Sequence, residues 1–222
     1  MLGRLRDFWS DGVLLIRHPG TSTFLTVAAK ADLPLAAAGS AAGGFVSGLL
    51  FNVFVLELAV LILALASNVE GFHIESADPI LLAALIGVAL GWLITMPFIA
   101  MLNSVVNLFI LAGCLFVSAQ LLGVRGSFAG LTYSLGALLT VASVVSAGLL
   151  VIPVAGWVAA AVFSIYLFAP LTNCLRAIFG IGAGKATLIW LAPLAAFLLL
   201  LLLLALPALV ASVVSPPDPG FL

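Results

Sequence analysis

Charge is scarce in this chain. Lysine and arginine together number 7 and aspartate and glutamate 8 among 222 residues, so charged residues make up 7% of the sequence, whereas soluble domains carry about 25%. A water-soluble fold cannot cover its surface with so few charged side chains. The formal net charge of −1 also gives no electrostatic basis for binding nucleic acid.

Cysteine and histidine are equally rare. Cys114 and Cys174 fall inside apolar segments, where a free cysteine behaves as a small hydrophobic residue. The histidines, His18 and His73, lie outside these segments. No ligand pair for a metal or another cofactor is visible, so we predict no cofactor. Serine, histidine and acid do not converge in a nucleophile motif, and we do not expect an enzyme.

Hydrophobic residues make up 65% of the chain and gather in long apolar stretches. These stretches are 33–66, 79–122, 128–152, 154–175 and 187–213. Each is long enough for a spanning helix of about 20 residues. The unbroken leucine run 198–204 is the opposite of the alternating polarity of membrane β-strands. The sequence therefore predicts an all-α, polytopic transmembrane helical bundle.

Two of the stretches are longer than one crossing needs. Stretch 33–66 would form a helix about 50 Å long and 79–122 one of about 65 Å, against a hydrocarbon core of about 30 Å. Either 79–122 crosses once, with 79–96 tilted or partly interfacial, or it breaks near Pro97 and crosses again. An additional crossing would place Arg125 and the later basic residues outside, against the positive-inside rule. We therefore predict five spans with a cytoplasmic N-terminus.

The N-terminal residues 1–32 have a different pattern and predict a short amphipathic helix in the membrane interface. Its expected apolar face holds Leu5, Phe8, Trp9 and Ile16, and its expected polar face holds Arg6, Asp7, Ser10, Asp11 and Arg17. The chain thus divides into the interfacial segment 1–32, the transmembrane bundle 33–213 and a short tail, 214–222.

Glu57 is an acid placed well inside an apolar stretch. An ionisable group at membrane depth marks a functional site by default, such as a proton or cation path. Because 33–66 is long, Glu57 can also lie near the far interface. The apolar stretches contain no second acid, histidine or lysine for a relay. We therefore favour the interfacial position and keep transport through Glu57 as the alternative.

Four amide side chains are candidate polar groups inside the membrane: Asn52, Asn103, Asn107 and Asn173. Asn103 and Asn107 lie four residues apart and share a helical face. They could line a polar passage, but interhelical hydrogen bonds are the commoner use of such residues.

Small residues recur at four-residue spacing, which lets helix backbones approach closely. One stripe consists of Ser40, Gly44, Gly48 and Asn52, and another of Gly87 and Gly91. The sequence does not decide whether the partner helix of each stripe belongs to this chain or to another protein.

Basic residues in the later turns are candidates for contact with anionic lipid headgroups: Arg125, Arg176 and Lys185. The glycine-rich turn before Lys185 is not a Walker loop, because Phe179 occupies the first glycine position and Ala186 follows the lysine.

Three sequence phrases carry a family resemblance. They are Leu15-Ile-Arg-His-Pro19 with Phe24, Gln120-Leu-Leu-Gly-Val-Arg-Gly-Ser-Phe128 with Leu131-Thr-Tyr133-Ser134, and Tyr166-Leu167 through Arg176 to Gly182-Ala-Gly-Lys185. In these phrases the chain resembles bacterial members of the Yip family, named for Ypt/Rab-interacting membrane proteins. The resemblance implies five transmembrane helices, a cytoplasmic N-terminus and location in the bacterial cytoplasmic (inner) membrane. Eukaryotic members are non-enzymatic factors in vesicle traffic that bind small GTPases.

These observations predict a non-enzymatic integral membrane protein. We expect it to act as an adaptor, scaffold or accessory subunit through helix–helix and lipid contacts. Its expected partners are the lipid bilayer and other membrane proteins or a second copy, with no nucleic acid and no soluble substrate. The alternative function is a small transporter or channel that uses Glu57 and the intramembrane asparagines.

Overall fold

The computed structural model describes residues 2–66 and 79–214, and every regular element in these ranges is an α-helix. The helices are α1 (Leu2–Arg17), α2 (Thr21–Ala28), α3 (Leu33–Ala66), α4 (Pro79–Leu121), α5 (Phe128–Leu150), α6 (Ala155–Tyr166), α7 (Phe168–Phe179) and α8 (Ala183–Val214). The all-α prediction is confirmed for this part of the chain. The predicted tail, from residue 215 on, lies outside the described residues.

Among the described residues, four helical segments are long and apolar enough to cross a membrane. They are Leu33–Ile62, Ile86–Leu121, Phe128–Leu150 and Ala155–Phe179. The chain is therefore a multi-pass, membrane-embedded helical protein. The last predicted stretch, 187–213, lies within the 32-residue helix α8.

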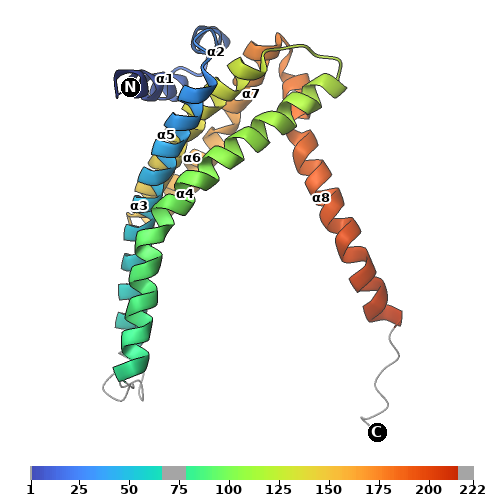
Figure 1. The fold of residues 1–222 in the computed structure, drawn as a ribbon. Helices are drawn as coiled ribbons and strands as arrows, with labels where there is room; N and C mark the ends of the chain where they lie inside the picture. Colours follow the sequence, from blue (N-terminus) through green and yellow to red (C-terminus); the bar gives the residue numbers. More distant parts are fainter. Residues whose placement is uncertain (1, 67–78, 215–222) are drawn as a thin grey trace.

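The two over-long stretches each form one continuous helix, of 34 residues in α3 and 43 residues in α4. Pro97 lies inside α4 and does not reverse the chain. Figure 1 shows α4 running beside α3 over its first part and then leaning away toward the start of α8. A proline in a helix removes one hydrogen bond and bends the axis, which accounts for the change of direction.

The stretch 154–175 is divided between two helices, a break that the sequence analysis did not predict. Helix α6 ends at Tyr166 and α7 begins at Phe168. Pro170 is the physical reason, because its nitrogen cannot bond the carbonyl of Tyr166 and its ring crowds that carbonyl. Helix α7 then ends at Phe179 and is capped by Gly180, whose φ of 63° is left-handed and suits glycine at a helix C-terminus.

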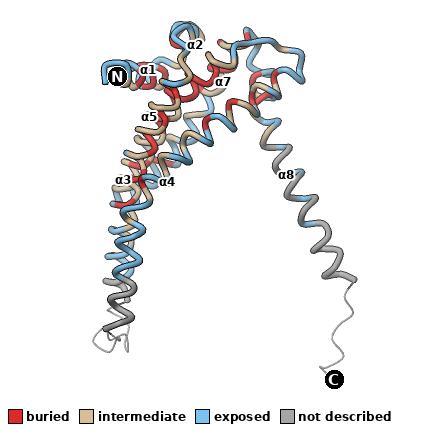
Figure 2. Tube along the Cα trace, in the orientation of Figure 1, coloured by how far each residue is buried: buried red, intermediate tan, exposed pale blue. Residues whose placement is uncertain are grey.

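The hydrophobic core surrounds the first part of α5. Buried residues come from every element that meets there, and they include Phe8, Leu15, Phe24, Val27, Leu131, Leu135, Leu138, Cys174 and Leu175. Figure 2 shows that buried residues concentrate at the end of the molecule that carries α1, α2 and α7. The opposite ends of α3 and α4 are largely exposed, as expected for surfaces that face lipid.

All seven lysines and arginines belong to elements at this same end of the molecule (Figure 1), which we call the basic end. They are Arg4, Arg6, Arg17, Lys30, Arg125, Arg176 and Lys185. The first three lie in α1, and the others lie in or beside the short connections that join the ends of the long helices.

The start of α8 packs against the bundle, whereas its later part diverges from it (Figure 1). Ala186 and Ile189 are buried, and Trp190 stacks on Phe168 with ring centroids 4.9 Å apart. Farther along the helix, the described side chains are exposed: Leu198 by 56% and Leu202 by 58%.

Candidate functional site

A cavity of about 590 Å³ lies at mid-length of the bundle, between α4, α5 and Pro193 of α8. Its volume is within the range of small-molecule sites, about 300–1,000 Å³. Most of its wall is apolar, including Leu108, Ile110, Leu111 and Leu139. Its polar lining consists of Ser40, Ser104, Asn107, Thr140, Ser143 and Ser146. We call this space the hydroxyl cavity, after the five hydroxyl side chains that line it.

Hydroxyl pairs on one side of the cavity join α3 to α5. Thr140 donates to the Ser40 oxygen over 3.4 Å, and the Ser47 and Ser143 hydroxyls lie 3.1 Å apart. Such bonds between membrane helices contribute about 0.6 kcal/mol on average. These hydroxyls were not among the predicted site residues except for Ser40, because serine and threonine are frequent in membrane helices and their pairing depends on the tertiary fold.

The two asparagines of α4 differ in their surroundings. Asn107 lines the hydroxyl cavity, whereas Asn103 does not, and both side chains are exposed. Neither amide makes a side-chain hydrogen bond within the described part of the chain. Of the two residues predicted to share a face of α4, Asn107 therefore lies at the cavity and Asn103 lies outside its lining.

Asn52 is buried between α3 and α4 and compensates for Pro97. Its Nδ2 atom donates to the Leu93 carbonyl oxygen over 2.6 Å. Leu93 is four residues before Pro97, so its carbonyl is the acceptor that the proline leaves without a backbone donor. Asn52 thus acts as an interhelical hydrogen-bonding residue at the bend of α4.

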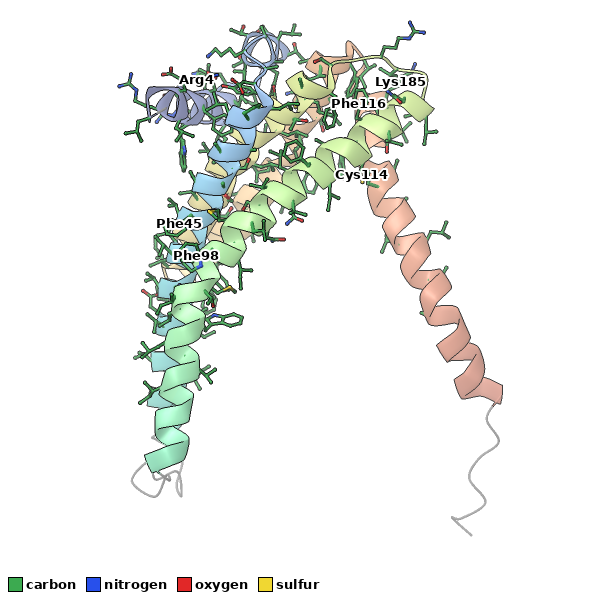
Figure 3. All side chains as sticks on the ribbon, in the orientation of Figure 1. Arg4, Phe45, Phe98, Cys114, Phe116 and Lys185 are labelled. Atoms are coloured by element: carbon green, nitrogen blue, oxygen red, sulfur yellow. The ribbon has the colours of Figure 1, made fainter. Side chains whose placement is uncertain are left out.

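The small-residue stripe of α3 faces α4 at this bend. A Cβ added at Gly44 would lie 2.6 Å from the Ala100 carbonyl oxygen, and one added at Gly48 would lie 2.7 Å from the Cα atom of Pro97. Phe45 and Phe98 pack edge-on nearby with centroids 5.5 Å apart (Figure 3). The α3 stripe therefore has an internal partner helix.

The second stripe has different surroundings. A Cβ added at Gly87 or Gly91 would meet no atom within 4 Å. This part of α4 is exposed in the described structure, so these glycines do not support a close approach to a helix of this chain among the described residues.

Glu57 is exposed near the end of α3 that lies away from the basic end. It borders a smaller space of about 130 Å³ together with Phe54, Pro153 and Trp157. This space is separate from the hydroxyl cavity, whose lining does not include Glu57.

The polar face predicted for α1 is wrong at one position. Asp11 is buried, with a relative exposure of 4%, and faces the bundle with Phe8 and Leu15. Its carboxylate accepts from Lys30 Nζ at 2.5 Å and from the Tyr133 hydroxyl at 3.1 Å. A buried carboxylate requires such charged and hydrogen-bonding partners. The α1 helix is thereby attached to α5 as well as to the start of α3, where Arg4 forms an ion pair with Asp32.

Further hydrogen bonds attach the α1–α2 turn to α6 and α7. Tyr166 donates its hydroxyl to the Ile16 carbonyl over 2.6 Å, and Asn173 donates to the Pro19 carbonyl over 2.7 Å. Asn173 in turn accepts from Arg176 over 3.1 Å. The structure thus places Asn173 at the basic end, in a role that fixes the N-terminal segment.

Two of the three predicted headgroup-binding residues are exposed: Arg125, in the connection between α4 and α5, and Lys185, which Figure 3 shows at the basic end. Arg125 borders a surface pocket with Gln120 and Phe116, whereas Arg176 is partly buried with its Nε atom enclosed. Exposed basic side chains at a membrane surface attract anionic headgroups by about 1 kcal/mol each.

Within the described residues, no group of three or more histidine, cysteine or acidic side chains is placed to hold a metal ion. No protein-family model, curated protein or solved structure matches the chain. The candidate sites are therefore argued from their geometry and chemistry alone.

Proposed function

We propose that the chain is a non-enzymatic integral membrane protein that acts as an adaptor or accessory subunit through contacts with other membrane helices and with lipid. The observation that carries this proposal is the later part of α8, which stands apart from the bundle (Figure 1) and exposes apolar side chains. The described side chains beyond Pro193 are all exposed, and we call them the apolar α8 surface: Ala195, Leu198, Leu199, Leu202 and Ala205.

The apolar α8 surface consists of leucine and alanine side chains. Lipid can cover such a surface, but a partner helix would add van der Waals packing and, at the alanines, close backbone approach. We therefore assign to the apolar α8 surface a transmembrane helix of another membrane protein as its partner.

The basic end supports a cytoplasmic N-terminus in this proposal. If α3, α4, α5, α6 with α7, and α8 each cross once, the connections at the basic end all face the cytoplasm, in agreement with the positive-inside rule. The arrangement is that of the Yip-family resemblance, with α1 lying along the interface of a bacterial inner membrane. We propose five crossings on this basis.

Transport through Glu57 has less support. Glu57 and Asn107 border separate spaces, and Asn52 is bonded to Leu93, so the predicted polar residues do not join into one path within the described structure. We therefore keep the adaptor as the single proposed function.

A photocrosslinking amino acid placed at Leu198 or at Leu202 tests the adaptor proposal in native membranes. We expect ultraviolet light to produce a discrete heavier species that contains a second membrane protein, because both side chains are exposed on the apolar α8 surface. The matched control is Leu138, which is fully buried in α5 and should give no intermolecular product. Adducts with lipid alone at both α8 positions would contradict the proposal.

A further inference from the structure

The hydroxyl cavity combines polar side chains with a depth at which water is scarce. Asn107 lies fourteen residues before the end of α4 at Leu121, about 21 Å along the helix axis. Thr140 lies twelve residues after the start of α5 at Phe128, about 18 Å along that helix. Because α4 leans beyond Pro97 and Ser40 lies only seven residues after the start of α3, these distances are upper limits on the depth. They place the cavity within a hydrocarbon core about 30 Å thick.

Asn107 is the cavity residue with the largest unmet hydrogen-bonding capacity. Its amide offers two donor hydrogens and a carbonyl acceptor, and it makes no side-chain hydrogen bond to the residues that the structure describes. In hydrocarbon, an amide without a partner costs several kcal/mol relative to water. A ligand that accepts from Asn107 would remove this cost.

The lining also limits the charge of an occupant. None of the described side chains that border the cavity is ionised at neutral pH. A phosphate or ammonium group at this depth would find no counter-charge, and such groups are expensive inside the bilayer. The wall beyond the polar side chains is aliphatic, with Ile110 and Leu111 on α4 and Leu139 on α5, and it suits a hydrocarbon tail.

We propose that the hydroxyl cavity binds one neutral amphiphile whose carbonyl or ester oxygens accept hydrogen bonds from Asn107 and the neighbouring hydroxyls while its apolar tail extends into the bilayer. This ligand specifies one of the lipid contacts of the adaptor, so the inference rests on the proposed function. Two sources share the required chemistry: a membrane quinone and a diacylglycerol.

Binding can be measured on the full chain in phosphatidylcholine nanodiscs, using a decyl-tailed benzoquinone that carries a diazirine. In the wild type we expect saturable labelling of peptides from 104–114 and 140–146. Unlabelled decylbenzoquinone and dioctanoylglycerol are the two neutral competitors, and the one that displaces the probe identifies the source. Dioctanoyl phosphatidylglycerol, with the same tails and a charged head, should not compete.

Two variants of α4 provide the matched comparison. Asn107→Leu should weaken probe binding about tenfold, or about 1.4 kcal/mol, whereas Asn103→Leu should leave it unchanged because Asn103 does not line the cavity. Cys114→Trp, at an exposed residue of the cavity wall, should block labelling by filling the space. Equal binding by Asn107→Leu and wild type, or equal competition by the charged lipid, would overturn the assignment.

The two proposals fail separately in this design. If the cavity assignment is wrong, crosslinking at Leu198 still reports a partner helix. If crosslinking at Leu198 and Leu202 yields lipid alone, the adaptor proposal fails. The ligand then has no role as a lipid contact of an adaptor, although the purified chain can still bind the probe in the hydroxyl cavity.

Discussion

At the scale of single residues, the structure shows how polar side chains in this apolar chain are stabilised by specific partners. Asn52 bonds the Leu93 carbonyl that Pro97 leaves without a backbone donor. Asp11 is held by Lys30 and Tyr133. In both cases a partner within hydrogen-bonding distance offsets part of the cost of burying the polar group, although the Oδ1 atom of Asn52 accepts no hydrogen bond among the described residues.

Replacement of Asn52 by leucine tests this account. The variant keeps the branched shape and the number of heavy atoms of the side chain but leaves the Leu93 carbonyl without its donor, so the free energy of unfolding should fall by about 1–2 kcal/mol. The measurement is an unfolding titration in mixed micelles with an ionic detergent. Asn103→Leu is the control, because Asn103 is exposed and its side chain makes no hydrogen bond among the described residues. Equal stability of the two variants would contradict the compensating role of Asn52.

The sequence was informative about some of these residues and not about others. The four-residue spacing of Ser40, Gly44 and Gly48 predicted close helix packing. Small side chains let helix backbones approach closely whether the partner helix belongs to this chain or to another protein. The burial of Asp11 could not be predicted, because Lys30 and Tyr133 lie 19 and 122 residues away along the chain. The burial of such an acid depends on tertiary contacts that local periodicity does not contain.

At the scale of helices, the packing of α3 against α4 depends on glycine at the bend. A Cβ at Gly48 would lie 2.7 Å from Pro97 Cα and 2.9 Å from Ala100 Cβ. Any larger residue must therefore separate the two helices. Pro97 was identified only as the place where 79–122 would break if it crossed twice, and a bend within one continuous helix was not predicted. The break at Leu167 was missed, although Pro170 was a visible signal.

Gly48→Leu and Gly91→Leu form a matched pair on the two helices. Both substitutions gain the same helix propensity, about 0.8–1 kcal/mol, but only the first introduces atoms into a filled space among the described residues. We expect Gly48→Leu to lower the thermal unfolding midpoint in detergent by several degrees, since overpacking costs about 1–3 kcal/mol. Gly91→Leu should leave the midpoint unchanged or raise it. A stable Gly48→Leu protein would show that α3 and α4 do not approach as described.

At the scale of the whole molecule, polarity is distributed along one axis. The basic end carries all seven lysines and arginines, together with the hydrogen bonds that attach α1 and α2 to the bundle, whereas the opposite end is formed by exposed apolar helices. Composition and charge predicted this arrangement well, since they reflect the membrane rather than specific contacts. The divergence of α8 could not be predicted in this way, because α8 is as apolar as the packed helices.

Reporter fusions across the chain most directly test the five-crossing arrangement, which the adaptor proposal needs in order to place α8 across the membrane. Fusions of a periplasm-active enzyme after residues 75, 125, 152 and 181, and at the C-terminus, determine the side of each connection. We predict reporter activity for fusions at 75, 152 and the C-terminus and no activity for fusions at 125 and 181, because basic residues flank 125 and 181 and keep these connections in the cytoplasm. An outside signal at residue 125 would contradict the arrangement.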